Sequence, residues 1–81
     1  MRYRVNVTLK NGVLDTQGKA IENSLQKNLG FEQVSNVRQG KLIELDVSET
    51  NKEAADKVVH DICDKLLVNQ VIEDYNFEVI N

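Results

Sequence analysis

The side chains best suited to covalent chemistry lie near residue 60. His60 and Cys63 are three residues apart, which places both on one face of a helix. A nucleophilic cysteine must ionise, but Cys63 falls within an apolar stripe, where burial favours the unreactive thiol. A structural zinc ion needs four ligands, and the chain has one histidine and one cysteine. We therefore predict neither a catalytic dyad nor a metal site in this segment.

The loop KNGVLDTQGKA, residues 10–20, has the composition of a phosphate-binding loop but not its spacing. The pattern G-x-x-x-x-G-K-[ST] places four residues between its glycines, whereas five separate Gly12 from Gly18. Ala20 stands where a hydroxyl would hold Mg²⁺, and Asp15 would set a negative charge against the phosphates. The loop is therefore predicted to be a turn that leads into a helix capped by Asp15, with Leu14 in the core.

The composition indicates one small domain spanning residues 1–81. Ten basic and thirteen acidic side chains give a net charge of −3, which argues against a nucleic-acid-binding protein. The sequence contains no long apolar run, so no membrane span is expected. A single cysteine fits a reducing, cytoplasmic setting. A domain of this length has a thin stability margin, so self-association is expected.

The elements that position these residues follow from hydrophobic periodicity. Residues 2–9 alternate strictly and predict a half-buried strand, and residues 73–79 do the same. A first helix should end at Gly30 in the left-handed conformation. Residues 34–47 read as two strands divided at Gly40, with Ile43 in the core. Thr50 and Glu53 fit a capping box that opens a second helix.

The predicted order is strand-helix-strand-strand-helix-strand. Each strand has one apolar face, so we expect an α+β, ferredoxin-like two-layer sandwich with an antiparallel sheet and both helices on one face. Arg2 and Arg4 should pair with carboxylates on the open face. RNA recognition would need aromatic side chains there, but Tyr3, Tyr75 and Phe77 fall on the core side.

Three segments of the chain resemble a known family. They are GVLDTQGKAI (residues 12–21), VRQGKLIELDV (residues 37–47) and KLLVNQVIEDYNFEV (residues 65–79). Together they resemble the PurS-type small subunit of phosphoribosylformylglycinamidine (FGAM) synthase, in the same order and over essentially the whole chain. Family members typically have proline where this chain has Thr16 and Gln70. At Thr16 the loss removes a local stiffener of the helix start.

The resemblance implies a non-catalytic subunit of a glutamine-hydrolysing, ATP-dependent ligase of purine biosynthesis. Its partners would be a glutaminase subunit and a large synthetase subunit, between which it would support ammonia transfer. The complex uses ATP and Mg²⁺, while this chain would bind no cofactor. The chain would self-associate as a dimer or a tetramer, with or without exchange of strands.

Gly12, Asp15, Gln17 and Gly18 lie in the most recognisable segment of that resemblance. We interpret them as a subunit docking surface, with helix capping as the competing structural role. Two other classes stay open at this point. A small dimeric ligand-sensing regulatory domain would be stabilised by a soluble small molecule, and a nucleic-acid module would show salt-dependent binding.

Overall fold

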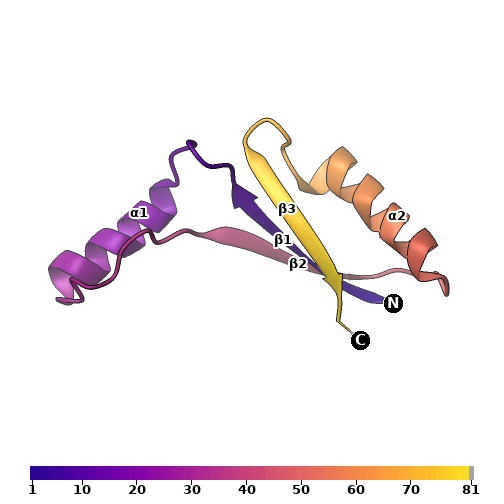
Figure 1. The fold of residues 1–81 in the computed structure, drawn as a ribbon, viewed down its shortest axis with the longest axis horizontal. Coiled ribbons are helices and arrows are strands. Elements are labelled where there is room, and N and C mark those ends of the chain that lie inside the picture. The colour runs from indigo at the N-terminus through magenta and orange to yellow at the C-terminus, as the bar shows by residue number, and fades with distance from the viewer. Residues whose placement is uncertain (81) are drawn as a thin grey trace.

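The computed structural model describes residues 1–80, so Asn81, the last residue of the predicted domain, lies outside the described part. The elements in chain order are β1 (Arg2–Leu9), α1 (Thr16–Asn23), the π-helical turn η1 (Ser24–Asn28), β2 (Gly40–Asp46), α2 (Lys52–Ile62), the π-helical turn η2 (Cys63–Leu67) and β3 (Glu73–Val79) (Figure 1). Within residues 1–80, no helix is both long and apolar enough to cross a membrane.

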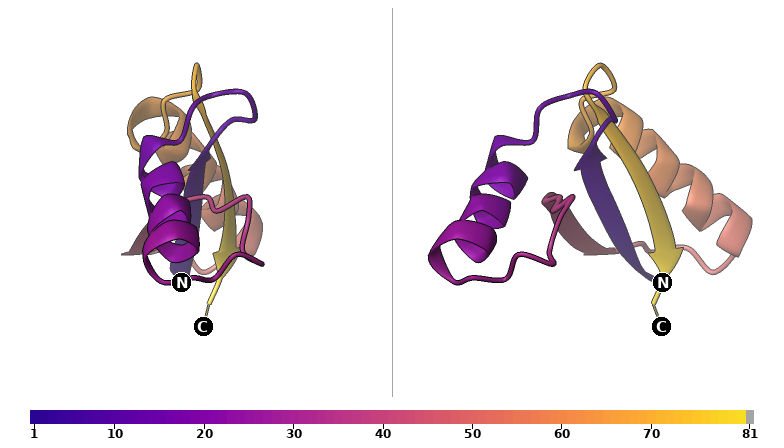
Figure 2. Two further views of the ribbon diagram at one scale, coloured as in Figure 1. Left: turned by 90° about the vertical axis from the view of Figure 1, so that its left-hand side faces the viewer. Right: turned by 60° about the vertical axis from the view of Figure 1, so that its left-hand side comes forward.

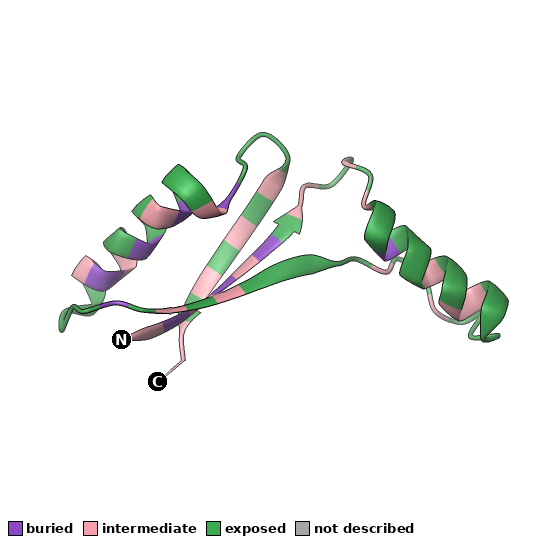
Figure 3. Ribbon diagram, turned by 180° about the vertical axis from the view of Figure 1, so that it is seen from behind, coloured by how far each residue is buried: buried purple, intermediate pink, exposed green. Residues whose placement is uncertain are grey.

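The strands form an antiparallel sheet in the order β2-β1-β3. β1 is central, so Val5 lies opposite Ile43 on one side and Phe77 on the other. The strict alternation of β1 is confirmed, since Tyr3, Val5 and Val7 are buried and the residues between them are not (Figure 3). The predicted α+β class, with an antiparallel sheet and two helices, is also confirmed.

The core lies between the sheet and α2. Ala55, Val59 and Cys63 from this helical segment are fully buried against the odd-numbered side chains of β1, which confirms the predicted burial of the thiol. The Tyr3 hydroxyl donates a 2.5 Å hydrogen bond to Asp56 Oδ1 and so ties the helix to the sheet. Burial, and next the Asp56 carboxylate, raise the pKa of Tyr3 to about 12.

The opposite face of the sheet is open and charged, as predicted. Arg2 pairs with Glu44 (3.3 Å) and Asp46 (3.1 Å) across the β1–β2 ladder. Arg4 pairs with Glu44 at 3.2 Å and with Glu78 on β3 at 3.6 Å. These exposed pairs bind the strands together in register but contribute little to stability individually.

The predicted fourth strand is wrong. Residues 34–39 form no strand, Asn36 among them has a left-handed φ of 57°, and the sheet of residues 1–80 has three strands. Two of their backbone N–H groups instead donate hydrogen bonds to a side chain of α1 and to the side chain of its N-cap residue, Asp15. Val37 N–H donates to Glu22 Oε1 (3.0 Å) and Gln39 N–H donates to Asp15 Oδ2 (2.8 Å). The segment therefore runs back along the helix rather than joining the sheet.

The predicted position of both helices over one face holds for α2 but not for α1. Residues 13–33, which include α1, form an arm that extends beyond the sheet. Figure 2 shows residues 34–39, the return segment, beside α1. Of its eight described residues only Gly18 is buried. Leu14 is 71% exposed, so its predicted place in the core is wrong, because the arm that carries it leaves the sheet. The radius of gyration is 16.1 Å, against about 12 Å for a compact domain of this length.

Of the two predictions about helix ends, the C-terminal one at Gly30 is confirmed and the N-terminal capping box is not. Gly30 has φ 78°, and Phe31 N–H donates to Leu25 O (2.8 Å), which confirms the predicted left-handed helix end. The predicted capping box is wrong by one residue at its start. Asn51 caps α2, because its Oδ1 accepts from the N–H groups of Glu53 (2.8 Å) and Ala54 (3.2 Å).

Candidate functional site

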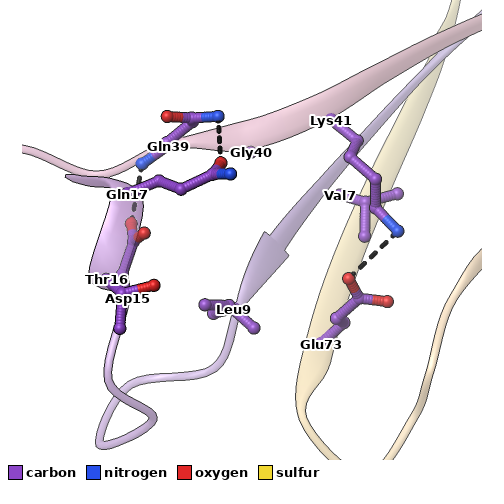
Figure 4. Close-up of a pocket in the computed structure, with 9 residues that line it drawn as sticks. All are labelled: Val7, Leu9, Asp15, Thr16, Gln17, Gln39, Gly40, Lys41 and Glu73. Carbon is purple, nitrogen blue, oxygen red and sulfur yellow. Dashed lines mark hydrogen bonds and ion pairs between the residues drawn. The ribbon is translucent and has the colours of Figure 1, made fainter.

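A pocket of about 260 Å³ lies where the start of α1 meets one end of the sheet. Three stretches far apart in the sequence line it, together with the end of β1 (Figure 4). Its lining residues are Val7, Leu9, Asp15, Thr16, Gln17, Gln39, Gly40, Lys41 and Glu73. The stretches at 15–17, 39–41 and 73 come one each from the three segments that carried the family resemblance.

Asp15 holds one wall of this pocket together. Its Oδ1 accepts from Gly18 N–H (2.8 Å), which caps α1, and its Oδ2 accepts from Gln39 N–H (2.8 Å). Hydrogen bonds to the ionised carboxylate favour that form. The bonds from Gln39 and Gly18, and then the nearby charge of Arg38, therefore lower the pKa of Asp15. The predicted cap is confirmed, and the same side chain also anchors the return segment.

Gly18 is buried directly behind Asp15. A Cβ atom at this position would lie 2.5 Å from Asp15 Oδ2 and 2.6 Å from the carbonyl oxygen of Val37. Glycine is therefore needed for the close approach of helix and return segment. Gly12 has a different role, because its φ of 89° makes the turn after β1 and it does not line the pocket.

The pocket rim carries amides and one ion pair. The side-chain amides of Gln17 and Gln39 bond to each other across the opening (Figure 4). Lys41 Nζ lies 3.2 Å from Glu73 Oε2, which joins the start of β2 to the start of β3. The other oxygen of Glu73 accepts from Asn69 N–H (2.8 Å). Every described ionised group of the pocket is thus already hydrogen-bonded within the chain.

Of the residues predicted from the sequence, the pocket brings together Asp15 and Gln17 with Gly18 behind them. Reasoning from the sequence missed Gln39, Lys41 and Glu73. All three residues lie within the segments on which the family resemblance rests, and their position there could have marked them as candidates. No local pattern marked them as neighbours of Asp15, because more than twenty residues separate them from it along the chain.

A second hollow, of about 380 Å³, lies between the end of the α2 segment and β3. The Tyr75 hydroxyl is 2.6 Å from His60 Nδ1 and donates to Asp64 Oδ1 (3.2 Å). Asp64 Oδ2 is 3.3 Å from His60 Nε2. Burial, and next the charge of Asp64, raise the pKa of Tyr75 to about 12, so this hydroxyl stays protonated and acts as a donor. Cys63 lies in the core, away from His60 on the surface.

The two hollows differ in the side chains that line them. No cysteine, histidine or serine lines the first pocket, and the His60 cluster of the second lacks a nucleophile other than a protonated phenol. Across residues 1–80, no group of three or more His, Cys, Asp or Glu side chains is arranged to hold a metal ion.

Comparison with known proteins assigns the chain to a family. The family model for PurS, described as phosphoribosylformylglycinamidine (FGAM) synthase, matches residues 2–81. The chain belongs to the PurS family. It is similar to the PurS subunit of phosphoribosylformylglycinamidine synthase from Bacillus subtilis, with 41% identity over 78 residues, or 96% of this chain and 90% of the relative. For the PurS subunit from Synechocystis the identity is 45% over 76 residues, or 94% and 75%.

Solved PurS structures have the same fold. The crystal structure of the PurS subunit from Thermotoga maritima superposes with a TM-score of 0.90 at 35% identity, covering 98% of this chain and 90% of that chain. A chain in the structure of PurLQS from Thermotoga maritima gives a TM-score of 0.91 at 35% identity, covering 98% and 95%. Because these superpositions cover almost the entire chain, they include the arm that carries α1.

Proposed function

We propose that this PurS-family chain is the small subunit of an FGAM synthase and that it acts by contact rather than by catalysis. The observation that carries the proposal is the family match over residues 2–81. The structure of PurLQS from Thermotoga maritima, which contains a chain of the same fold, supports an assembly role. The charged side chains of the first pocket are bonded within the chain and the Tyr75 phenol of the second hollow stays protonated, which fits a subunit without an active site of its own.

The proposal divides the chemistry among subunits. A glutaminase subunit hydrolyses glutamine to glutamate and ammonia. A synthetase subunit then uses this ammonia, with ATP and Mg²⁺, to convert formylglycinamide ribonucleotide to FGAM, ADP and phosphate. The present chain, acting in the cytoplasm and binding no cofactor itself, assembles the two and supports passage of ammonia between them.

Self-association is part of the proposal because the isolated chain leaves much apolar surface uncovered. The α1 arm exposes Ile21, Leu29 and Phe31, and the long axis of the molecule reaches 49 Å. Several large apolar side chains left exposed on an element that does not pack on the sheet favour an interface there. A dimer or tetramer would cover the arm and add the burial that a three-stranded sheet with one packed helix lacks.

We assign subunit docking to the first pocket and the loop that forms it, at Gly12, Asp15, Gln17 and Gly18. Asp15 and Gly18 support this surface from within the chain. Both carboxylate oxygens of Asp15 accept hydrogen bonds, and Gly18 is buried. Gln17 is exposed at the rim and is the better probe of contact. Changing it does not remove the helix cap.

The test is reconstitution with two nitrogen sources. Without the chain, glutamine-dependent FGAM formation should fall far below ammonia-dependent formation, because free ammonia needs no delivery between subunits. The Gln17→Arg variant should show the same selective loss, since a longer charged side chain would obstruct the rim. Gln33→Arg, at an exposed position in the turn before the return segment, is the matched control. Equal loss with both nitrogen sources on omission of the chain would contradict the proposed role.

A further inference from the structure

Two strongly exposed apolar side chains belong to the chain segments that form the second hollow. Val71 is 82% exposed and Leu66 is 80% exposed, the highest values among large apolar residues of the described chain. Each lies within two residues of a lining residue of the hollow. Isolated exposed apolar residues are ordinary, but two such strongly exposed residues in the segments that form one concave polar site favour a contact surface there.

The second hollow is acidic. Asp64, Glu73 and Asp74 line it, against the single ammonium group of Lys10. Of these carboxylates Glu73 is already paired with Lys41, so Asp64 and Asp74 supply the available negative charge. The ion pair of Lys10 with Asp74 is long (3.8 Å) and exposed, so it leaves that carboxylate accessible. Tyr75 and His60 form one aromatic side of the lining, with ring centroids 5.9 Å apart. A cationic side chain would find carboxylates and an aromatic face together here.

The surface is held in place before any partner arrives. Lys10 N–H donates to Ile72 O (2.8 Å), which fastens the loop after η2 to the end of β1. Asn69 Oδ1 accepts from Val71 N–H (3.1 Å), and Ile72 N–H donates to Asn69 O (3.1 Å), so the tip of the loop is a closed turn. A pre-ordered loop loses little entropy on binding.

We propose that this surface, consisting of Leu66, Val71 and the acidic hollow, docks a segment of another protein that carries a lysine or arginine beside apolar side chains. The proposal rests on the proposed function, in that the protein is one of the other two subunits of the synthase. Charge complementarity selects this occupant, because the carboxylates attract a basic side chain and repel nucleic-acid phosphates. Glu73 lines both hollows, so this surface adjoins the docking pocket.

The test measures affinity of the purified glutaminase and synthetase subunits for Val71→Ser, Asp74→Asn and the double variant, at low and high salt. Leu42→Ser and Glu49→Gln make matched changes of polarity and charge at exposed positions outside this surface. The double variant should bind one of the two subunits about tenfold or more weakly, as expected for loss of an anchor and a complementary charge. The controls should stay within about twofold, and Asp74→Asn should reduce the salt dependence of binding.

Three results would overturn the inference. Affinities of the double variant within about twofold of the unaltered chain would show that the surface is not used. An effect of Val71→Ser without any effect of Asp74→Asn would refute the basic occupant. A change in the sedimentation mass of Val71→Ser alone would identify a second copy of this chain as the occupant. If the unaltered chain binds neither subunit, the proposed function itself fails and this inference fails with it.

Discussion

Substituting alanine for Gly18 is expected to destabilise the fold, against the usual effect of this change in a helix. At an unconstrained helical position, Gly→Ala stabilises by about 1 kcal/mol. At Gly18 the new Cβ would meet Asp15 Oδ2 at 2.5 Å and Val37 O at 2.6 Å. Both contacts are too short to persist, so the Asp15 carboxylate and the return segment must move.

The expected size follows from the bonds that this movement breaks. Losing the cap of α1 costs about 0.5–2 kcal/mol, and losing the bond from Gln39 N–H costs about 1 kcal/mol. After the gain in helix propensity is subtracted, we expect a net loss of about 0.5–2 kcal/mol. For a domain of this length each kcal/mol lowers Tm by roughly 4–8 °C.

Thermal unfolding followed by circular dichroism, at one fixed protein concentration, measures the effect. Asn23→Ala is the control, because this residue is exposed on the same helix and should leave Tm unchanged or slightly higher. In an Asp15→Ala background the cost of Gly18→Ala should shrink, since one of the two clashing groups is gone. A higher Tm for Gly18→Ala alone would refute the close packing of α1 against the return segment.

Two further outcomes are expected. Thr16→Pro should stabilise the chain by about 0.4–1 kcal/mol in urea unfolding, because Thr16 is the first residue of α1 and Asp15 before it is extended (φ −94°, ψ 90°). A lower unfolding midpoint would show that the Thr16 N–H is needed. The raised pKa values of Tyr3 and Tyr75, each about 12, mean that the folded state keeps protons that the unfolded state releases above its own pKa of about 10. Stability should therefore be unaffected by these groups below about pH 10 and fall between about pH 10 and pH 12. Tyr3→Phe should reduce that fall, and a fall of unchanged size would contradict the assignment to Tyr3.

Much of the secondary structure was predictable because it depends on near neighbours. Strict alternation identified β1 and its buried residues, and glycine at position 30 identified the end of the first helical segment. Asp15 was correctly predicted as a cap, since the bond that it makes spans only three residues. The family assignment also came from the sequence, through three segments in a fixed order.

Local pattern failed where the partner of a residue lies far along the chain or outside it. Residues 34–39 have the composition of a strand, but a strand needs a neighbour, and α1 occupies the place beside them. Leu14 reads as a core residue, yet the arm that carries it leaves the sheet. An apolar side chain indicates that burial is favourable, but it does not indicate which surface will cover it.

Sequence patterns alone identified β1, β3, the left-handed helix end at Gly30, the buried thiol and the family. The tertiary structure was needed to show that Gln39, Lys41 and Glu73 meet Gln17 at one pocket, and that Leu66 and Val71 are strongly exposed in the segments that form the second hollow. The physical reason is the range of the interactions involved. Caps and alternating faces are settled within a few residues, whereas a contact surface depends on how whole elements are placed against one another.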